Sequence, residues 1–347
     1  MLIDGRQNYL DYARGLSIIL VVFFHSSIAL EGYDLVDPRY WVMNNFFSPI
    51  RMPVFFFVSG LLAKSALENP SEEKISKKVL GVFYIFSVWT IIHLVWGQLY
   101  KNTDSIEFKE FFSFFYNPNS FLWFVWALGL YFIIARIGNS LSKSCTLTFA
   151  ICISFLTCAG IIKFDNYVHS NVAIYFPIFL LGAWHSGFFL NIKYSENFII
   201  IFVSISALFL FFVISSRGVM GEQWIGMLRF FILFLGGFIG ISISKIVCQN
   251  FQSSALVKIP SFIGRNTLSI YVAHAPILGL LADVISKFLY SSSTIRILSV
   301  PAISVTAIVM SLWLIAIIKK IGFGWLYNAP EKLVSFKIPF PKIRSAD

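Results

Sequence analysis

The feature that most constrains this chain is a series of long apolar stretches that recurs from the first residues almost to the last. A helix of about 20 residues crosses the roughly 30 Å hydrocarbon core of a bilayer. With 57% hydrophobic residues and a mean hydropathy of +0.77, the chain has too little polar surface to cover a soluble globule. The sequence therefore predicts an all-α polytopic membrane protein with about ten transmembrane helices. The predicted spans are 11–30, 45–66, 79–99, 121–138, 145–162, 171–190, 197–215, 224–247, 263–288 and 295–318.

The connections between these spans leave no room for a soluble domain. We expect one transmembrane domain over 1–318 and a short basic tail over 319–347, which is too short to fold alone. The longest predicted connections are 31–44, 67–78, 100–120 and 248–262.

The charge of the chain reports its orientation. The sequence holds 27 Lys and Arg against 17 Asp and Glu, a basic balance that could indicate a nucleic-acid partner. These cations are spread over the connections between spans, however, so we expect no nucleic-acid partner. With a cytoplasmic N-terminus, most of them fall on inner segments, and the positive-inside rule then predicts that both termini are cytoplasmic.

The cysteines give no sign of a metal site. The four of them show neither paired ligand spacing nor a disulfide framework. We therefore expect no metal, and we assign the cysteines no chemical role.

Two ionisable residues interrupt the first span, where an ionisable side chain is costly and indicates a function. Arg14 and His25 are eleven residues apart, which on a helix is within about 20° of three full turns and a rise of about 16 Å. They therefore share one face at two depths, and Asp11 begins the same strip. This arrangement suits a long substrate with a charged head and a reactive tip.

His25 is predicted to lie in the outer half of the bilayer. A neutral imidazole is the ordinary side chain for taking a proton from an alcohol near neutral pH. Arg51 and Arg229, on two descending spans, are expected at a similar depth, where they could hold an oxyanion or a sugar hydroxyl. The alternative for each arginine is that it reaches to lipid headgroups.

Other polar groups lie in the second and ninth spans. Ser59 offers a hydroxyl beside Gly60, although small residues in membrane helices usually serve helix contact. In the ninth span, Asn266 adds a hydrogen-bonding group, and Tyr271 and His274 share a face because they are three residues apart. This polar density favours a lined cavity over a lipid-facing surface.

A polar link between the second and third spans carries Lys74, Lys77 and Lys78. It lies on the predicted cytoplasmic side, where a soluble anionic cofactor would arrive. The lysines are therefore candidates for an electrostatic landing site, or else carry topological charge alone.

These residues alone leave the class of function open. Catalysis would use His25 as a base, whereas a transporter or flippase for a lipid-linked sugar would line a pathway with the same groups. A receptor or scaffold would use them only for helix association.

Several motifs, in order along most of the chain, resemble those of the acyltransferase-3 family of integral membrane acyltransferases. The first span matches its Leu-Asp-x-x-Arg-Gly opening and its Arg-x10-His signature. Weaker matches are its Phe-Phe-x-Ser-Gly, Leu-Trp-Phe and Tyr-x-x-His elements. The matching segments here are Leu10 to Gly15 with His25, Phe55 to Gly60, Leu122 to Phe124 with Trp123 at its centre, and Asn266 to His274.

The resemblance implies transfer of an acyl group, usually acetyl, from coenzyme A in the cytoplasm to a hydroxyl of a glycan or lipid-linked sugar. It implies that Arg14 and His25 are the central functional pair. It also implies a stand-alone form similar to bacterial inner-membrane enzymes that O-acetylate surface polysaccharide. The chain departs from the family at Lys74-x-x-Lys77, where many members have Arg-x-x-Arg, and lysine lacks the bidentate fork of arginine.

Overall fold

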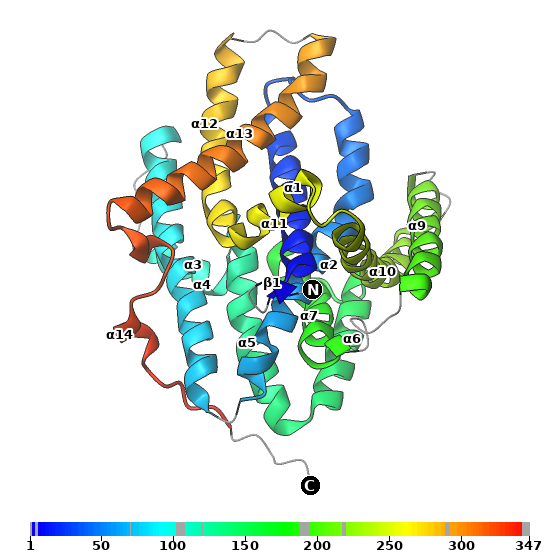
Figure 1. The fold of residues 1–347 in the computed structure, drawn as a ribbon, viewed down its shortest axis with the longest axis vertical. Coiled ribbons are helices and arrows are strands. Elements are labelled where there is room, and N and C mark those ends of the chain that lie inside the picture. The colour runs from blue at the N-terminus through cyan, green and yellow to red at the C-terminus, as the bar shows by residue number, and fades with distance from the viewer. Residues whose placement is uncertain are drawn as a thin grey trace. The chain divides into compact units, whose positions relative to one another are not determined.

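The computed structural model describes residues 2–3, 6–69, 71–101, 108–118, 121–187, 194–216, 220–288 and 292–341. The described chain is almost entirely helical (Figure 1), which confirms the predicted all-α class. Its strands are the antiparallel two-residue pair β1 (Leu2–Ile3) and β2 (Arg6–Gln7). The helices are α1 (Asn8–Glu31), α2 (Arg39–Leu67), α3 (Glu72–Lys101), α4 (Phe108–Tyr116), α5 (Trp123–Leu141), α6 (Lys143–Cys158), α7 (Tyr167–Trp184), α9 (Tyr194–Ser216), α10 (Glu222–Asn250), α11 (Ala255–Arg265), α12 (Thr267–Phe288), α13 (Ser293–Lys320), the 3₁₀ turn η1 (Gly324–Leu326) and α14 (Glu331–Val334).

A helix covers most of every predicted apolar stretch. This is expected in a membrane, because lipid offers no hydrogen-bond partner and backbone groups must bond within their own segment. Over the described residues, 7 of these helices are long and apolar enough to cross a membrane. They are α1, α2, α3, α5, α10, α12 and α13. The protein is therefore a polytopic membrane protein, while the full count of about ten spans and the cytoplasmic position of both termini stay predictions.

The structure corrects several predicted boundaries. The connection predicted over 67–78 is much shorter, because α2 continues to Leu67 and α3 already begins at Glu72. The predicted 248–262 connection contains most of α11, and the predicted ninth span 263–288 begins inside that helix. Helical hydrogen bonding also includes polar residues that flank the apolar ones, so hydropathy alone places the starts of these helices too late.

The chain divides into two compact units, and each is described by itself. The first comprises Met1–Val58, Phe189–Gly221 and Phe231–Lys320. The second comprises Ser59–Phe188, Glu222–Phe230 and Ile321–Asp347. The predicted division into 1–318 and 319–347 is not tested by this result and stays a prediction.

In the first unit, α1 packs against α11, α12 and α13 (Figure 1). Its crossing with α11 is a contact between backbones. A Cβ atom added to Gly15 would lie 1.9 Å from the carbonyl oxygen of Pro260, and one added to Gly264 would lie 1.7 Å from that of Asp11. Only glycine fits at either position, so this pair fixes the start of α1 against the end of α11.

In the second unit, α3 packs against α5, and α6 packs against α7. The segment 321–341 is bonded along α3 and the end of α5. The Trp89 indole donates to the Leu326 carbonyl at 2.8 Å, the Ile338 amide donates to the Ser76 hydroxyl at 3.0 Å, and the Ser140 hydroxyl donates to the Pro341 carbonyl at 2.7 Å. Residues 321–341 thus fold onto these helices.

Candidate active site around His25 and His274

The centre of the candidate site is a pair of histidines on α1 and α12. His25 Nδ1 lies 2.8 Å from His274 Nε2, although 249 residues separate the two in the chain. Their rings are stacked, with centroids 5.0 Å apart and planes 22° from parallel. His274 is fully buried. Two imidazoles in direct hydrogen-bond contact can share and pass a proton.

The backbone of α12 sets the tautomer of this pair. His274 Nδ1 lies 2.6 Å from the carbonyl oxygen of Tyr271 and 3.2 Å from that of Ile270. A carbonyl only accepts, so His274 Nδ1 carries a proton, and Nε2 of the neutral ring is an acceptor. His25 Nδ1 must then donate to it. This assignment leaves the lone pair of neutral His25 on Nε2, the atom a general base uses.

Arg51 is brought close to His25, as predicted from its position on the second span. Its guanidinium carbon lies 4.1 Å from the centroid of the Phe24 ring, and that ring lies 5.4 Å from the ring of His25. Arg51 is within electrostatic reach of the imidazole. A fixed cation stacked on the neighbouring ring can stabilise negative charge that develops beside His25.

Asp11, Arg14 and His25 all lie on the continuous helix α1, as the sequence predicts. Arg14 Nη1 lies 3.7 Å from Asp11 Oδ1, and the side chains are 19% and 4% exposed respectively. Asp11 therefore holds the arginine in a half-buried position. Along an ideal helix Arg14 and His25 are about 16 Å apart.

Two further predicted residues are Tyr271, which contacts His274, and Asn266, which lies at the start of the same helix. Tyr271 is buried, and its ring centroid lies 5.7 Å from that of His274. Asn266 sits between α11 and α12, where its amide donates to the carbonyl of Phe262 at 3.0 Å and its own carbonyl accepts from the amide of Ile270. Asn266 thus joins the two helices, and one of them carries His274.

Ser59, Trp123 and Arg229 belong to the second unit. Beside Ser59, a Cβ atom on Gly60 would lie 2.0 Å from the carbonyl oxygen of Phe179, so this glycine allows α2 and α7 to touch. The Trp123 ring lies 6.2 Å from that of Tyr175, and Arg229 is exposed on α10. The roles predicted for these three residues stay predictions.

The three lysines predicted to attract an anion lie on the first turns of α3 and have different surroundings. Lys74 is exposed. Lys77 pairs with Glu73 at 2.7 Å, and the Lys78 ammonium lies 5.8 Å from the centroid of the Phe132 ring. Because a carboxylate already offsets the charge of Lys77, we expect Lys74 and Lys78 to contribute most of the attraction.

Sequence reasoning missed the buried cation Arg136 on α5. Arg136 is 1% exposed, and its Nη1 donates to the carbonyls of Leu67 at 3.1 Å and Asn69 at 3.3 Å. The amide of Asn139 donates to Leu67 as well, at 2.9 Å. Together they bind carbonyls at the C-terminus of α2. A signal was present, since Arg136 and Asn139 lie three apart near the end of an apolar stretch.

No group of three or more His, Cys, Asp or Glu side chains in the described residues is placed to hold a metal ion.

Comparisons with known proteins agree with the motifs. Residues 7–319 match the family described as acyltransferase domain. A curated relative is the inner membrane protein YcfT of Escherichia coli strain K12, which is 22% identical over 203 residues. The aligned region covers 52% of this chain and 56% of that protein, so the chain spans about half the length of the relative. No solved structure matches the chain.

Proposed function

The chain belongs to the acyltransferase-3 family, and on that premise we propose that it is a membrane O-acyltransferase. It moves an acetyl or other short acyl group from coenzyme A to a hydroxyl of a glycan or lipid-linked sugar. The observation that carries the proposal is the contact between His25 and His274, because their hydrogen bonds leave the lone pair of His25 on Nε2. In this proposal the protein lies in the bacterial cytoplasmic (inner) membrane, with both termini in the cytoplasm.

His25 acts as the general base. Its Nε2 takes the proton of the acceptor hydroxyl while that oxygen attacks the carbonyl of the acyl donor, and the donor supplies a thioester. As His25 becomes charged, its Nδ1 keeps donating to His274 Nε2, so His274 orients the ring and stabilises the imidazolium. The proton then passes from Nε2 to the departing thiolate. The products are an ester and a free thiol, and His25 is neutral again.

Arg51 supplies the electrostatic part of the reaction. Negative charge develops on the carbonyl oxygen during the attack, and a preorganised cation near it lowers the barrier. The stacking of Arg51 on Phe24 supports this role, because it holds the guanidinium beside His25. Arg229 is the second cation proposed for this charge.

The residues present fit an anionic donor. Arg14, held by Asp11, lies on the same helical face as His25 and about three turns before it. Lys74, Lys77 and Lys78 are proposed to attract the phosphates as the donor arrives from the cytoplasm. They provide charge without a bidentate fork, so we expect attraction without precise alignment.

The test is transfer from labelled acetyl-CoA by the full chain reconstituted in vesicles, with the surface glycan of the host as acceptor. His25→Ala should abolish transfer while the protein remains folded and inserted. The matched control is His185→Ala, which changes an exposed histidine at the end of α7. Full activity of the His25 variant would remove that residue from the mechanism. Movement of a lipid-linked sugar without any use of donor would instead support the transporter.

A further inference from the structure

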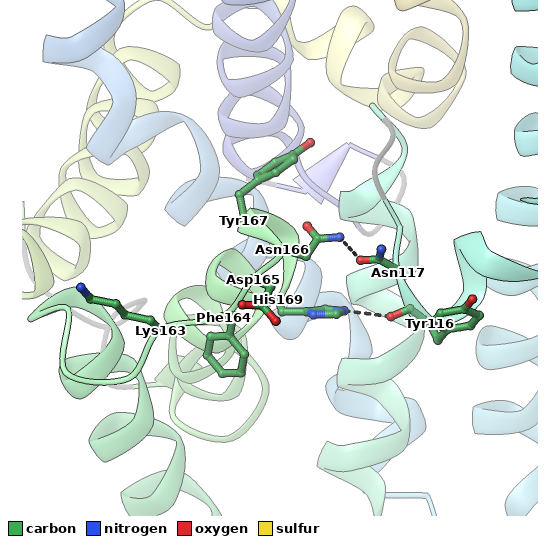
Figure 2. A pocket seen from close by; sticks show the side chains of 8 residues that line it. All are labelled: Tyr116, Asn117, Lys163, Phe164, Asp165, Asn166, Tyr167 and His169. Carbon is green, nitrogen blue, oxygen red and sulfur yellow. Dashed lines mark hydrogen bonds between the residues drawn. The ribbon is translucent and has the colours of Figure 1, made fainter.

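A pocket of about 680 Å³ opens between the end of α4 and the start of α7, within the second unit. Tyr116 and Asn117 line it on one side, and residues from the segment 163–169 line it on the other (Figure 2). Pockets that bind small molecules commonly have volumes of about 300–1,000 Å³. The site is therefore large enough for one or a few sugar rings.

The two walls of this pocket are tied together. The Asn166 amide donates to the side-chain oxygen of Asn117, and His169 Nε2 donates to the Tyr116 carbonyl at 2.9 Å, as the dashed lines in Figure 2 mark. Behind the wall, the Trp126 indole donates to the Phe115 carbonyl at 3.0 Å. These bonds hold the pocket open in advance, so a ligand need not order it.

The chemistry of the lining matches a sugar. Tyr116 and Tyr167 line the pocket and are 67% and 54% exposed, so two aromatic rings are available to pack against the C–H side of a pyranose. Asp165 adds carboxylate acceptors for hydroxyl groups, and Lys163 adds three donors. The charges of Lys163 and Asp165 are opposite and offset each other in the lining. The pocket thus favours a neutral polyhydroxylated ligand over an acidic one.

The predicted topology puts this pocket on the side of the acceptor. One wall belongs to the predicted connection 100–120, and the other lies in and just after the link between α6 and α7. The positive-inside rule assigns both connections to the outer face. We propose that the pocket binds a neutral glycan and serves as a docking subsite for the acceptor. The second half of this statement rests on the proposed function. Exposed tyrosines at a membrane interface otherwise serve only as anchors among headgroups, which is the alternative the test must separate.

The experiment measures binding to the full chain in lipid nanodiscs without donor. One probe is the surface polysaccharide of the host, stripped of its esters by mild alkali, and a parallel arm uses its lipid-linked repeat unit. The double variant Tyr116→Ala, Tyr167→Ala removes both rings, while the carbonyl of residue 116 remains to bind His169. The matched control is Tyr33→Ala, another exposed tyrosine in a connection. A thermal unfolding curve checks that each variant is folded.

We expect the double variant to bind the glycan about tenfold more weakly or worse, and Asp165→Ala to weaken it too, while Tyr33→Ala binds normally. The KM for acetyl-CoA should stay unchanged. The arm that shows the loss identifies polymer or precursor as the ligand. Equal binding by wild type and double variant in both arms, including no binding by either, overturns the proposal. Binding through the pocket without acyl transfer would refute the proposed function alone.

Discussion

At the scale of single residues, the histidine pair separates two jobs that a sequence motif does not distinguish. His25 is proposed to exchange a proton with the acceptor, whereas His274 has one nitrogen bonded to a backbone carbonyl and the other to His25. We interpret His274 as a positioning residue, because its contacts act on the tautomer and orientation of another side chain.

This assignment predicts how two substitutions differ. His274→Leu removes the acceptor for His25 Nδ1 and should lower kcat by about a hundredfold, with the KM for donor unchanged. His274→Gln offers an amide oxygen in the same region and should recover a large part of the activity. Steady-state kinetics from pH 5 to 9 provide the measurement. If both variants lose activity equally and keep the wild-type pH profile, His274 has only a packing role.

Arg51 gives a second prediction at this scale. Arg51→Met keeps much of the apolar volume above Phe24 but removes the charge, so kcat should fall by about 10²- to 10³-fold with little change in either KM. Arg51→Lys should fall between this variant and the wild type, because it keeps the charge and loses the planar guanidinium. Arg39→Met is the control, since Arg39 begins the same helix, is exposed and pairs with Asp37. Wild-type kcat in Arg51→Met would exclude the electrostatic role.

Part of this site was predictable and part was not. Arg14 and His25 stand out because they are costly in an apolar helix, and Arg51 because it interrupts a second one. The contact between His25 and His274 was not predictable from spacing, since it depends on how α1 and α12 pack. The pairing of Lys77 with Glu73 was readable from their i, i+4 spacing but was passed over.

At the scale of helices, the crossing of α1 and α11 explains why a glycine follows Arg14. Gly15 admits the backbone of α11, and Gly264 admits that of α1. The sequence presents Gly15 as one letter of a motif, while the structure gives it a packing reason. Any side chain at either glycine would push α11 away from α1, the helix that carries Asp11, Arg14 and His25.

We therefore predict that Gly15→Ala and Gly264→Ala each destabilise the protein by about 1–3 kcal/mol, the usual cost of overpacking. Thermal unfolding in detergent is the measurement. Gly279→Ala on α12 is the matched control, because nothing lies within 4 Å of a Cβ atom there. Gly279→Ala should be neutral or slightly stabilising. Unchanged unfolding temperatures at both Gly15 and Gly264 would contradict the observed closeness of the backbones.

The helix ends illustrate what hydropathy leaves out. The break between α11 and α12 falls at Asn266, inside a stretch that reads as one apolar span. At that point the Asn266 amide bonds back to Phe262, and the Thr267 hydroxyl donates to the carbonyl of Gly264. Such short polar side chains compete with the helix for backbone hydrogen bonds and therefore favour a break. The surrounding apolar residues keep the average hydropathy high, so a hydropathy analysis does not detect this break.

At the scale of the whole molecule, the distribution of Lys and Arg predicts sidedness. In a background without native cysteines, Lys163→Cys should react with a membrane-impermeant maleimide on intact cells. Lys74→Cys should react only after permeabilisation, because the positive-inside rule assigns it to the cytoplasm. Both positions are in connections or first helical turns. The reverse pattern of labelling would invert the topology and remove the case for a cytoplasmic donor.

The same orientation predicts how the lysines affect the donor. Changing Lys74 and Lys78 together to Gln should raise the apparent KM for acetyl-CoA severalfold and leave kcat unchanged. Lys77→Gln alone should have a smaller effect, since Glu73 already pairs with that lysine. Initial rates at low and high salt provide the check, because screening should shrink the difference. A KM that is independent of all three lysines would limit them to topology.

The tail has a practical consequence for anyone who produces or truncates this protein. Because Ser76, Trp89 and Ser140 are each bonded to the segment 321–341, cutting the chain after α13 would strip three partners from α3 and α5 at once. Screening of shortened clones should therefore spare everything up to Pro341. An affinity tag is better fused after Asp347 than at Lys320, even though the last predicted span already ends near that lysine.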